Sequence, residues 1–258
     1  MSKPLILISN DDGITSKGIS KLVHAAKNFG EVVVVAPDSP QSGMGHAITV
    51  GDSLRLRESD IFGDVEAYEC SGTPADCVKL GKHFVLKERK IDLVLSGVNH
   101  GSNSAINVLY SGTMSAAIEG AVEGLPAIGF SYCDYDPNAE MSHIDEYLAL
   151  IIKQALEKDF QRGIALNVNF PVKQQEKIKG IKFCRQADAT WEENFDERTD
   201  PYGRKYFWMV GNFVNRDKGE DNDEWALANN YISIVPCQFD MTGHHAISSL
   251  NRDWSLNL

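Results

Sequence analysis

The chain begins with a short apolar run that ends abruptly in two adjacent carboxylates. Leu5 to Ile8 shows no polar alternation, so a strand here would be buried on both faces. The run leads into Ser9-Asn10-Asp11-Asp12-Gly13, after which the pattern becomes helical. Adjacent carboxylates at the mouth of a buried strand repel each other and resist desolvation. The pair therefore predicts positive charge beside it, and a divalent cation is the simplest candidate.

The first two thirds of the chain alternate short β-branched runs with amphipathic stretches. This rhythm is typical of a parallel sheet covered by helices. The expected strands are Leu5 to Ser9, Val32 to Ala36, Leu93 to Ser96, Ala127 to Ser131 and Ala165 to Asn169.

Helical spacing of apolar residues separates these strands. Ile19, Leu22, Val23 and Ala26 recur at helical intervals, and further helices are expected near Pro74 to Leu80, over Ser111 through Gly124 and over Met141 to Phe160. Before the second of these helices, Leu54 to Leu56 and Val65 to Tyr68 predict a small inserted hairpin.

The pattern changes beyond Pro171, and we expect two parts, residues 1–171 and 172–258. The second part is poorly periodic, apart from an expected strand at Tyr231 to Val235. Its aromatic residues lack an obvious core of their own; they are Trp191, Phe195, Tyr202, Phe207 and Trp208. Two interpretations stay open: the segment packs on another subunit, or it is an irregular α+β extension on its own sheet.

Composition restricts the class of protein. In 258 residues, 43% apolar content is ample for a core, and the net charge of −11 disfavours nucleic-acid duplexes and anionic membranes. Five scattered cysteines without metal-like spacing indicate reduced thiols. Because the chain has neither a signal-like apolar segment nor a membrane-length one, we expect a cytoplasmic protein.

Three polar segments follow expected strands. They contain Asp11-Asp12, the stretch from Pro37 to His46, and the stretch from Ser96 to Asn103. In an open parallel sheet, ligands bind beyond the carboxyl ends of the strands. Asp11, Asp12, Ser42 and Asn99 would supply a set of oxygen ligands that suits Mg²⁺ or Mn²⁺ better than zinc. Taken alone, Asp-Asp-Gly is also an ordinary turn and helix cap.

A fourth segment predicts an anion site. Tyr110-Ser111-Gly112-Thr113 comes directly before an Ala-rich helix, where free N–H groups and hydroxyls can face a phosphate. In isolation such a motif is better explained as an ordinary Ser/Thr N-cap, but beside a metal loop it becomes a substrate clamp. His46 and His100 lie in the polar loops, where each is either a substrate contact or a solvated histidine.

These motifs together resemble the survival protein E family, the SurE-type 5′-nucleotidases. The ordered matches span the N-terminal two thirds: Ser9-Asn10-Asp11-Asp12-Gly13, Ala36-Pro37 with Gln41-Ser42-Gly43, Ser71-Gly72-Thr73-Pro74-Ala75-Asp76-Cys77-Val78, Ser96-Gly97-Val98-Asn99-His100-Gly101-Ser102-Asn103, and Tyr110-Ser111-Gly112-Thr113 with Ala116-Ala117 and Glu119-Gly120. The chain departs from the family at Ala105, Asn222, Asn230 and Val235, none of which is an expected metal ligand.

The resemblance implies an α/β fold, a Rossmann-like doubly wound and mostly parallel sheet with a hairpin insertion and an extended C-terminal oligomerisation segment. It implies a phosphomonoesterase that hydrolyses nucleoside monophosphates, with 3′-nucleotides and short polyphosphate as further possible substrates. It carries the metal ligands over to Asp11, Asp12, Ser42 and Asn99. One Mg²⁺ or Mn²⁺ per subunit and a homodimer or homotetramer are expected.

The expected mechanism is attack by a metal-activated water on the phosphoryl group. Asp11 or Asp12 would accept the proton of the water, and Asn103, Ser111, Gly112 and Thr113 would hold the phosphoryl oxygens. A phospho-aspartyl enzyme is disfavoured because it usually requires Asp-x-Asp after the first strand. A nucleotide-binding sensor that uses metal without catalysis remains the alternative.

Overall fold

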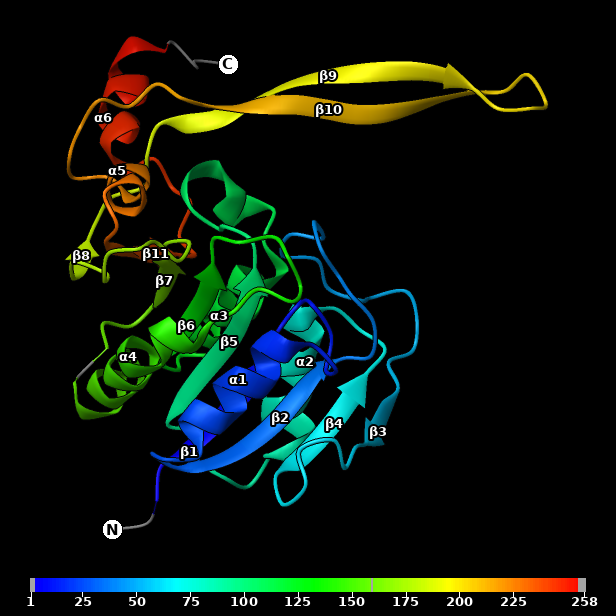
Figure 1. Ribbon diagram of the computed structural model, residues 1–258, viewed down its shortest axis with the longest axis vertical. Helices are drawn as coiled ribbons and strands as arrows, with labels where there is room; N and C mark the ends of the chain where they lie inside the picture. Colours follow the sequence, from blue (N-terminus) through cyan, green and yellow to red (C-terminus); the bar gives the residue numbers. More distant parts are fainter. Residues whose placement is uncertain (1–2, 159, 255–258) are drawn as a thin grey trace.

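The central feature of the structure is a nine-stranded sheet, most of which is parallel (Figure 1). The computed structural model describes residues 3–158 and 160–254. Within these residues the strands lie in the order β3-β4-β2-β1-β5-β6-β7-β11-β8, and β4 through β7 in that order are parallel to one another. The bounds are Leu5–Ser9 (β1), Glu31–Pro37 (β2), Leu56–Glu58 (β3), Glu66–Cys70 (β4), Leu93–His100 (β5), Ala127–Tyr132 (β6), Ile164–Phe170 (β7), Ile181–Phe183 (β8) and Ile232–Gln238 (β11).

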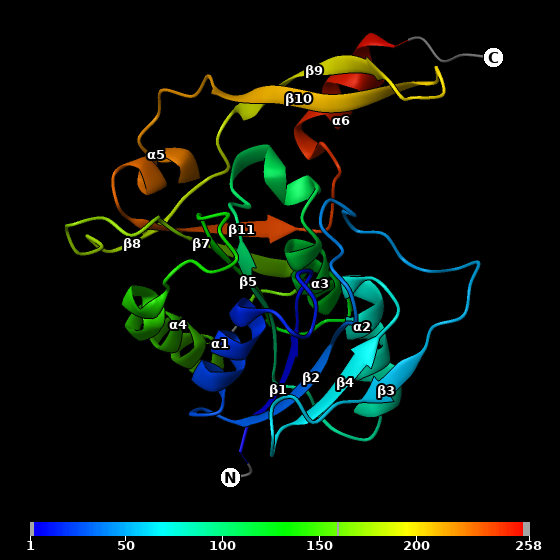
Figure 2. The ribbon, with the colours of Figure 1, turned by 45° about the vertical axis from the view of Figure 1, so that its right-hand side comes forward.

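Helices cover both faces of this sheet (Figure 1 and Figure 2). On one face, Ile6 and Ile8 of β1 pack in a core with residues of α1 (Lys17–Ala26) and α4 (Asp145–Glu157). On the other, Leu5 and Leu7 pack in a core with residues of α2 (Pro74–Leu80) and α3 (Gly112–Val122). Burial on both faces explains why the first strand lacks polar alternation. None of the helices in the described part of the chain combines the length and apolar character required to span a membrane.

The predicted α/β architecture is confirmed, and β1 and α2 have the expected bounds. The inserted hairpin is β3 paired antiparallel with β4. The helix expected over Met141 to Phe160 begins as a short 3₁₀ turn, Ser142–Ile144 (η3), and α4 then ends at Glu157. Two further short helical turns are Gly81–Val85 (η1) and Ala105–Leu109 (η2).

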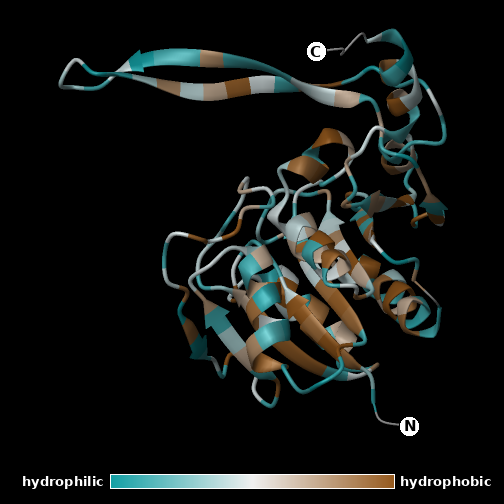
Figure 3. Ribbon diagram, turned by 180° about the vertical axis from the view of Figure 1, so that it is seen from behind, coloured by the Kyte–Doolittle hydropathy of each residue, from teal (hydrophilic) through white to brown (hydrophobic). Residues whose placement is uncertain are grey.

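The C-terminal part is more regular than its sequence pattern indicates. Ala189–Thr199 (β9) and Lys205–Asn215 (β10) pair antiparallel over their whole length and form a long hairpin that projects from the body of the molecule (Figure 1). Figure 3 shows apolar and polar residues interspersed along this hairpin, in contrast to the largely apolar strands of the central sheet. The strand expected at Tyr231 to Val235 is β11. The described residues of this part also form the helices Asp223–Ala228 (α5) and His244–Asp253 (α6).

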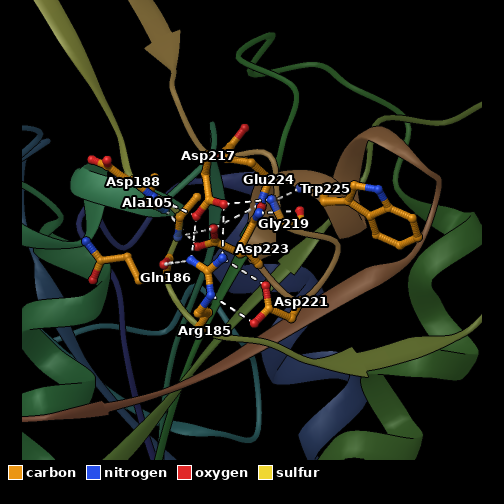
Figure 4. Close-up of polar contacts among 12 residues, drawn as sticks. Ala105, Arg185, Gln186, Asp188, Asp217, Gly219, Asp221, Asp223, Glu224 and Trp225 are labelled. Carbon is orange, nitrogen blue, oxygen red and sulfur yellow. Dashed lines mark hydrogen bonds and ion pairs between the residues drawn. The ribbon is translucent and has the colours of Figure 1, made fainter.

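A buried acid joins α5 to the loop after β5 (Figure 4). The Asp223 side chain accepts hydrogen bonds from the backbone N–H of Ala105 at 2.8 Å, of Ala187 at 2.9 Å and of Glu224 at 2.9 Å. Burial raises the pKa of Asp223, although these donors oppose the shift. The contacts connect the C-terminal part to the segment that follows Asn103.

Candidate functional site

The carboxyl ends of β2, β1 and β5 lie side by side at one edge of the sheet. After β1 the chain moves outward through β2 and β4, and after β5 it moves in the opposite direction through β6 and β7. The strand order therefore reverses between β1 and β5, which is where open α/β sheets bind ligands. The three polar segments predicted from the sequence follow or end these three strands.

One cavity of about 640 Å³ lies at this edge. Five of the predicted site residues line it: Asp11, Ser42, Asn99, Asn103 and Ser111. They come from four segments of the chain, so the fold brings together what the sequence separates. Asp12, Gly112 and Thr113 do not line this cavity among the described residues, although each contacts a group that does.

Asp11 is almost fully enclosed, with only 4% of its surface exposed. Burial raises the pKa of Asp11 to about 6, and the like charge of Asp12 adds to the shift. The Thr113 hydroxyl donates a hydrogen bond to Asp11 Oδ1, and this bond opposes the rise of the Asp11 pKa. A buried carboxylate whose nearest charge has the same sign is an arrangement that a cation would stabilise.

Asp12 lies beside His100. Its Oδ2 accepts a hydrogen bond from the backbone N–H of His100 at 3.2 Å and lies 3.2 Å from His100 Nδ1. About a fifth of its side chain is exposed. The two acids that adjoin in sequence thus have different environments, one enclosed and one at the end of β5.

The loop that carries Ser42 is attached to its neighbours at several points. The backbone N–H of Gln41 donates to Asp11 O at 2.8 Å, and that of Gly45 donates to Tyr110 O at 3.2 Å. His46 Nε2 lies 2.8 Å from Glu119 Oε2, and Glu119 also accepts a hydrogen bond from Lys79 at 2.7 Å. Burial would raise the pKa of Glu119, but these two partners outweigh it and lower that pKa.

The available donors are mainly oxygen atoms. Within residues 3–158 and 160–254, no set of three or more His, Cys, Asp and Glu side chains is arranged to hold a metal ion. A cation here would therefore need the Ser42 hydroxyl and the Asn99 amide as well as the carboxylates. The Asn99 Nδ2 donates to Gly101 O at 2.8 Å. The side-chain carbonyl oxygen of Asn99 is therefore the atom that would bind a cation.

Asn103 is held by a buried polar network that sequence analysis missed. Its backbone N–H donates to Asn169 Oδ1 at 2.9 Å, its Nδ2 donates to Ser131 Oγ at 2.7 Å, and its carbonyl accepts from Asn167 Nδ2 at 2.8 Å. Asn169 and Asn167 also bond each other at 2.9 Å. Polar residues two apart at the carboxyl end of a buried strand are the signal that could have found this network.

The start of α3 combines the two roles that the sequence left open, a helix N-cap and part of the substrate site. Ser111 caps the helix, because its Oγ accepts the backbone N–H of Met114 at 3.0 Å, yet it also lines the cavity. Gly112 packs directly against Asp11, since a Cβ there would lie 2.6 Å from Asp11 Cβ. Thr113 is fully buried and bonds Asp11.

A larger hollow of about 980 Å³ lies between α1 and α4. Basic and acidic side chains line it together, including Lys17, Lys21, Asp145 and Glu146. None of the predicted site residues is among the described residues that line it. Size alone therefore does not identify the functional site.

The fold and the site define a class: a doubly wound α/β protein with an acidic, oxygen-rich cavity at the switch point of its sheet. A family model described as Survival protein SurE matches residues 6–193, and the chain belongs to the SurE family. A protein from Cytophaga hutchinsonii named 5′-nucleotidase SurE is 65% identical over 254 residues, 98% of each chain. A protein of the same name from Flavobacterium psychrophilum is 58% identical over the full length of both chains.

A solved structure agrees with the family assignment. The crystal structure of the Sure protein from Aquifex aeolicus superposes with a TM-score of 0.83 at 39% identity, covering 96% of this chain and 99% of that one. The resemblance seen in the sequence motifs and the predicted α/β class with a mostly parallel sheet are both confirmed. The oligomerisation role of the C-terminal segment stays a prediction.

The buried Asp11 carboxylate is expected to lower the free energy of unfolding of the protein at neutral pH. Because its pKa rises from 3.8 in the unfolded chain to about 6, the native state binds the proton more tightly, and the free energy of unfolding falls as pH rises between these values. With chelator present, we expect the free energy of unfolding of Asp11→Asn to exceed that of the wild type by about 2–3 kcal/mol at pH 7.5. Below pH 4 the two should be nearly equal.

Urea unfolding at both pH values measures this difference. Asp60→Asn, which removes an exposed carboxylate far along the chain, is the matched control and should change little. Equal stability of wild type and Asp11→Asn at pH 7.5 would contradict the account of Asp11.

Proposed function

We propose that this chain is a 5′-nucleotidase, a metal-dependent phosphomonoesterase that hydrolyses nucleoside monophosphates. The observation that carries the proposal is the convergence of Asp11, Ser42 and Asn99 on one cavity with Asn103 and Ser111. Relatives that match nearly the whole chain bear the name 5′-nucleotidase SurE, which supports the same activity here. These names favour an enzyme over a sensor that binds nucleotides without turnover.

The proposed ligands of the metal are Asp11, Asp12, Ser42 and Asn99. Their carboxylate, hydroxyl and amide oxygens suit a hard cation, and we propose one Mg²⁺ or Mn²⁺ per subunit. Bound there, the cation would lower the pKa of a water and offset charge on the phosphoryl oxygens. The raised pKa of Asp11 in its buried position supports a cation at this place.

The side chains divide the remaining work. A carboxylate oxygen of Asp11 or Asp12 accepts the proton of the attacking water. Asn103 and Ser111, which line the cavity, are proposed to hold the phosphoryl oxygens. Gly112 and Thr113 lie behind them in the first turn of α3 and contribute through the positive end of the helix dipole. Thr113 also orients Asp11 through its hydroxyl. The buried asparagine network keeps Asn103 in place without rearrangement during the reaction.

We further propose a cytoplasmic homodimer or homotetramer in which residues 1–171 form the catalytic core. Free thiols at all five cysteines support a reducing compartment. The hairpin in residues 172–258 carries exposed apolar side chains on β9 and β10, which supports contact with another subunit: Phe195, Phe207, Trp208, Met209 and Val210.

Phosphate release tests the function. With Mn²⁺ or Mg²⁺ the protein should release phosphate from AMP, and chelator should lower the rate by about a hundredfold or more. The same assay with 3′-AMP and tripolyphosphate tests the two further possible substrate classes. Asp11→Asn should lose at least about a hundredfold in kcat/KM, whereas Asp60→Asn should retain it. AMP binding without any phosphate release would leave the sensor as the better account.

The contact between Gly112 and Asp11 gives a second test. In Gly112→Ala the new Cβ would lie 2.6 Å from Asp11 Cβ and 3.0 Å from Oδ2, so the carboxylate must move. We expect the affinity for Mn²⁺ to fall about tenfold or more, measured by titration calorimetry. Gly51→Ala, where a Cβ meets nothing within 4 Å, is the control. Unchanged Mn²⁺ affinity in Gly112→Ala would argue against Asp11 as a ligand.

Sedimentation tests the assembly. The wild type should sediment at a multiple of 28.5 kDa, and replacement of Phe207 and Trp208 together by Ser should shift it towards the single chain. Phe84→Ser, an exposed apolar residue on η1, should leave the mass unchanged. A wild type that stays a single chain at micromolar concentration would contradict the proposal.

A further inference from the structure

The cavity at the site is too large for a phosphate group alone. Its volume of about 640 Å³ lies within the range of pockets that hold whole small molecules. The phosphate-binding residues account for one part of its wall. The rest of the wall comes from the loops of the core, including His100, Ser102 and Tyr135, and from the β9–β10 hairpin. The hairpin residues that line it are Trp191, Glu193, Met209, Val210 and Gly211.

The hairpin presents one face to this cavity. Trp191 and Glu193 are two apart on β9, and they pair with Phe213 and Gly211 on β10, so all four lie on the same side of the hairpin. Gly211 has no side chain to fill the space between its neighbours, and a Cβ there would lie 2.7 Å from Glu192 O. Gly211 is therefore a position where the two backbones lie too close for any side chain, and it lines the cavity together with Trp191 and Glu193.

The indole of Trp191 is fixed in place while part of it stays exposed. Its Nε1 donates to Asn107 Oδ1 at 2.8 Å, and its ring meets Phe213 edge-on with centroids 5.4 Å apart. Some 37% of the residue remains exposed. Because the ring is already oriented, a planar ligand can stack on it without a further cost of ordering the side chain.

Other residues of the cavity favour a neutral planar group over a second anion. Glu193 places a carboxylate beside Trp191, which would repel phosphate and accept hydrogen bonds from amino groups. Tyr135 supplies a second aromatic ring on the side of the core, where it packs over Gly101. A nucleobase has the planarity and the exposed N–H donors that this part of the cavity suits.

We propose that the base of the β9–β10 hairpin is the nucleoside subsite of this protein, with Trp191 as the surface on which the nucleobase stacks. The inference rests on the proposed function and adds to it the residues that recognise the leaving group. The core then binds the phosphate, and the hairpin distinguishes a nucleotide from other monoesters.

Selectivity between two substrates provides the test. Ribose 5-phosphate has the ester and the sugar of AMP but no base, so kcat/KM is measured for both by phosphate release with saturating Mn²⁺. In Trp191→Ala the ratio of the AMP value to the ribose 5-phosphate value should fall roughly tenfold to a hundredfold, mainly through KM. Trp191→Phe keeps an aromatic ring and should recover most of the ratio.

The control variant removes a tryptophan that does not line the cavity. Trp254→Ala, at the end of α6 and outside the described residues that line the cavity, should leave the ratio unchanged. If Trp191→Ala lowers kcat/KM equally for both substrates, or for neither, the ratio stays constant and the proposal is overturned.

Binding of adenosine separates this proposal from the hydrolytic one. Adenosine carries no phosphate, so its affinity, measured by calorimetry, reports the subsite alone. Trp191→Ala should weaken it about tenfold or more whether or not the wild type releases phosphate. If wild type and variant bind adenosine equally, Trp191 is not the base platform. If the wild type hydrolyses no ester yet binds adenosine through Trp191, the proposed function fails and the subsite stands.

Discussion

The structure of the site depends on an enclosed carboxylate with a like charge as its neighbour. Asp11 follows the end of β1 and is almost without exposure, and burial together with the charge of Asp12 raises its pKa to about 6. A hydrophobic core would avoid this arrangement, because a buried charge is costly without a compensating partner. Gly112 and Thr113 pack against it, and Gln41 bonds its backbone, so two other segments of the chain are built around one unfavourable group.

The topology explains why these segments meet. β1 lies at the centre of the parallel sheet, with β2 on one side and β5 on the other, so the loops after all three strands emerge together. Asn167 and Asn169 on β7 then bond Asn103 and fix the loop that follows β5. A polar network of this kind is stable only when its members are satisfied. Here the side-chain N–H donors of Asn103, Asn167 and Asn169 each meet an oxygen acceptor.

The buried core and the polar segments could be predicted from the sequence because their signals are local. β1 and α2 have the expected bounds, and five of the expected site residues line one cavity. The hairpin could not be predicted in the same way, because both of its faces are largely exposed and no apolar alternation marks it. Side-chain directions were equally out of reach: Asp12 faces His100, and Thr113 faces Asp11, through contacts about 90 to 100 residues apart in sequence.

The position of β11 has a consequence for how the chain is made. β11 lies between β7 and β8 in the sheet, although it is encoded more than 60 residues after β7. During synthesis from the N-terminus, the outer edge of β7 therefore has no partner strand until residues 232–238 have emerged from the ribosome. An open, apolar strand edge readily pairs with other chains. The nascent protein thus passes through a stage that is prone to aggregation, and that stage ends only when β11 has been added.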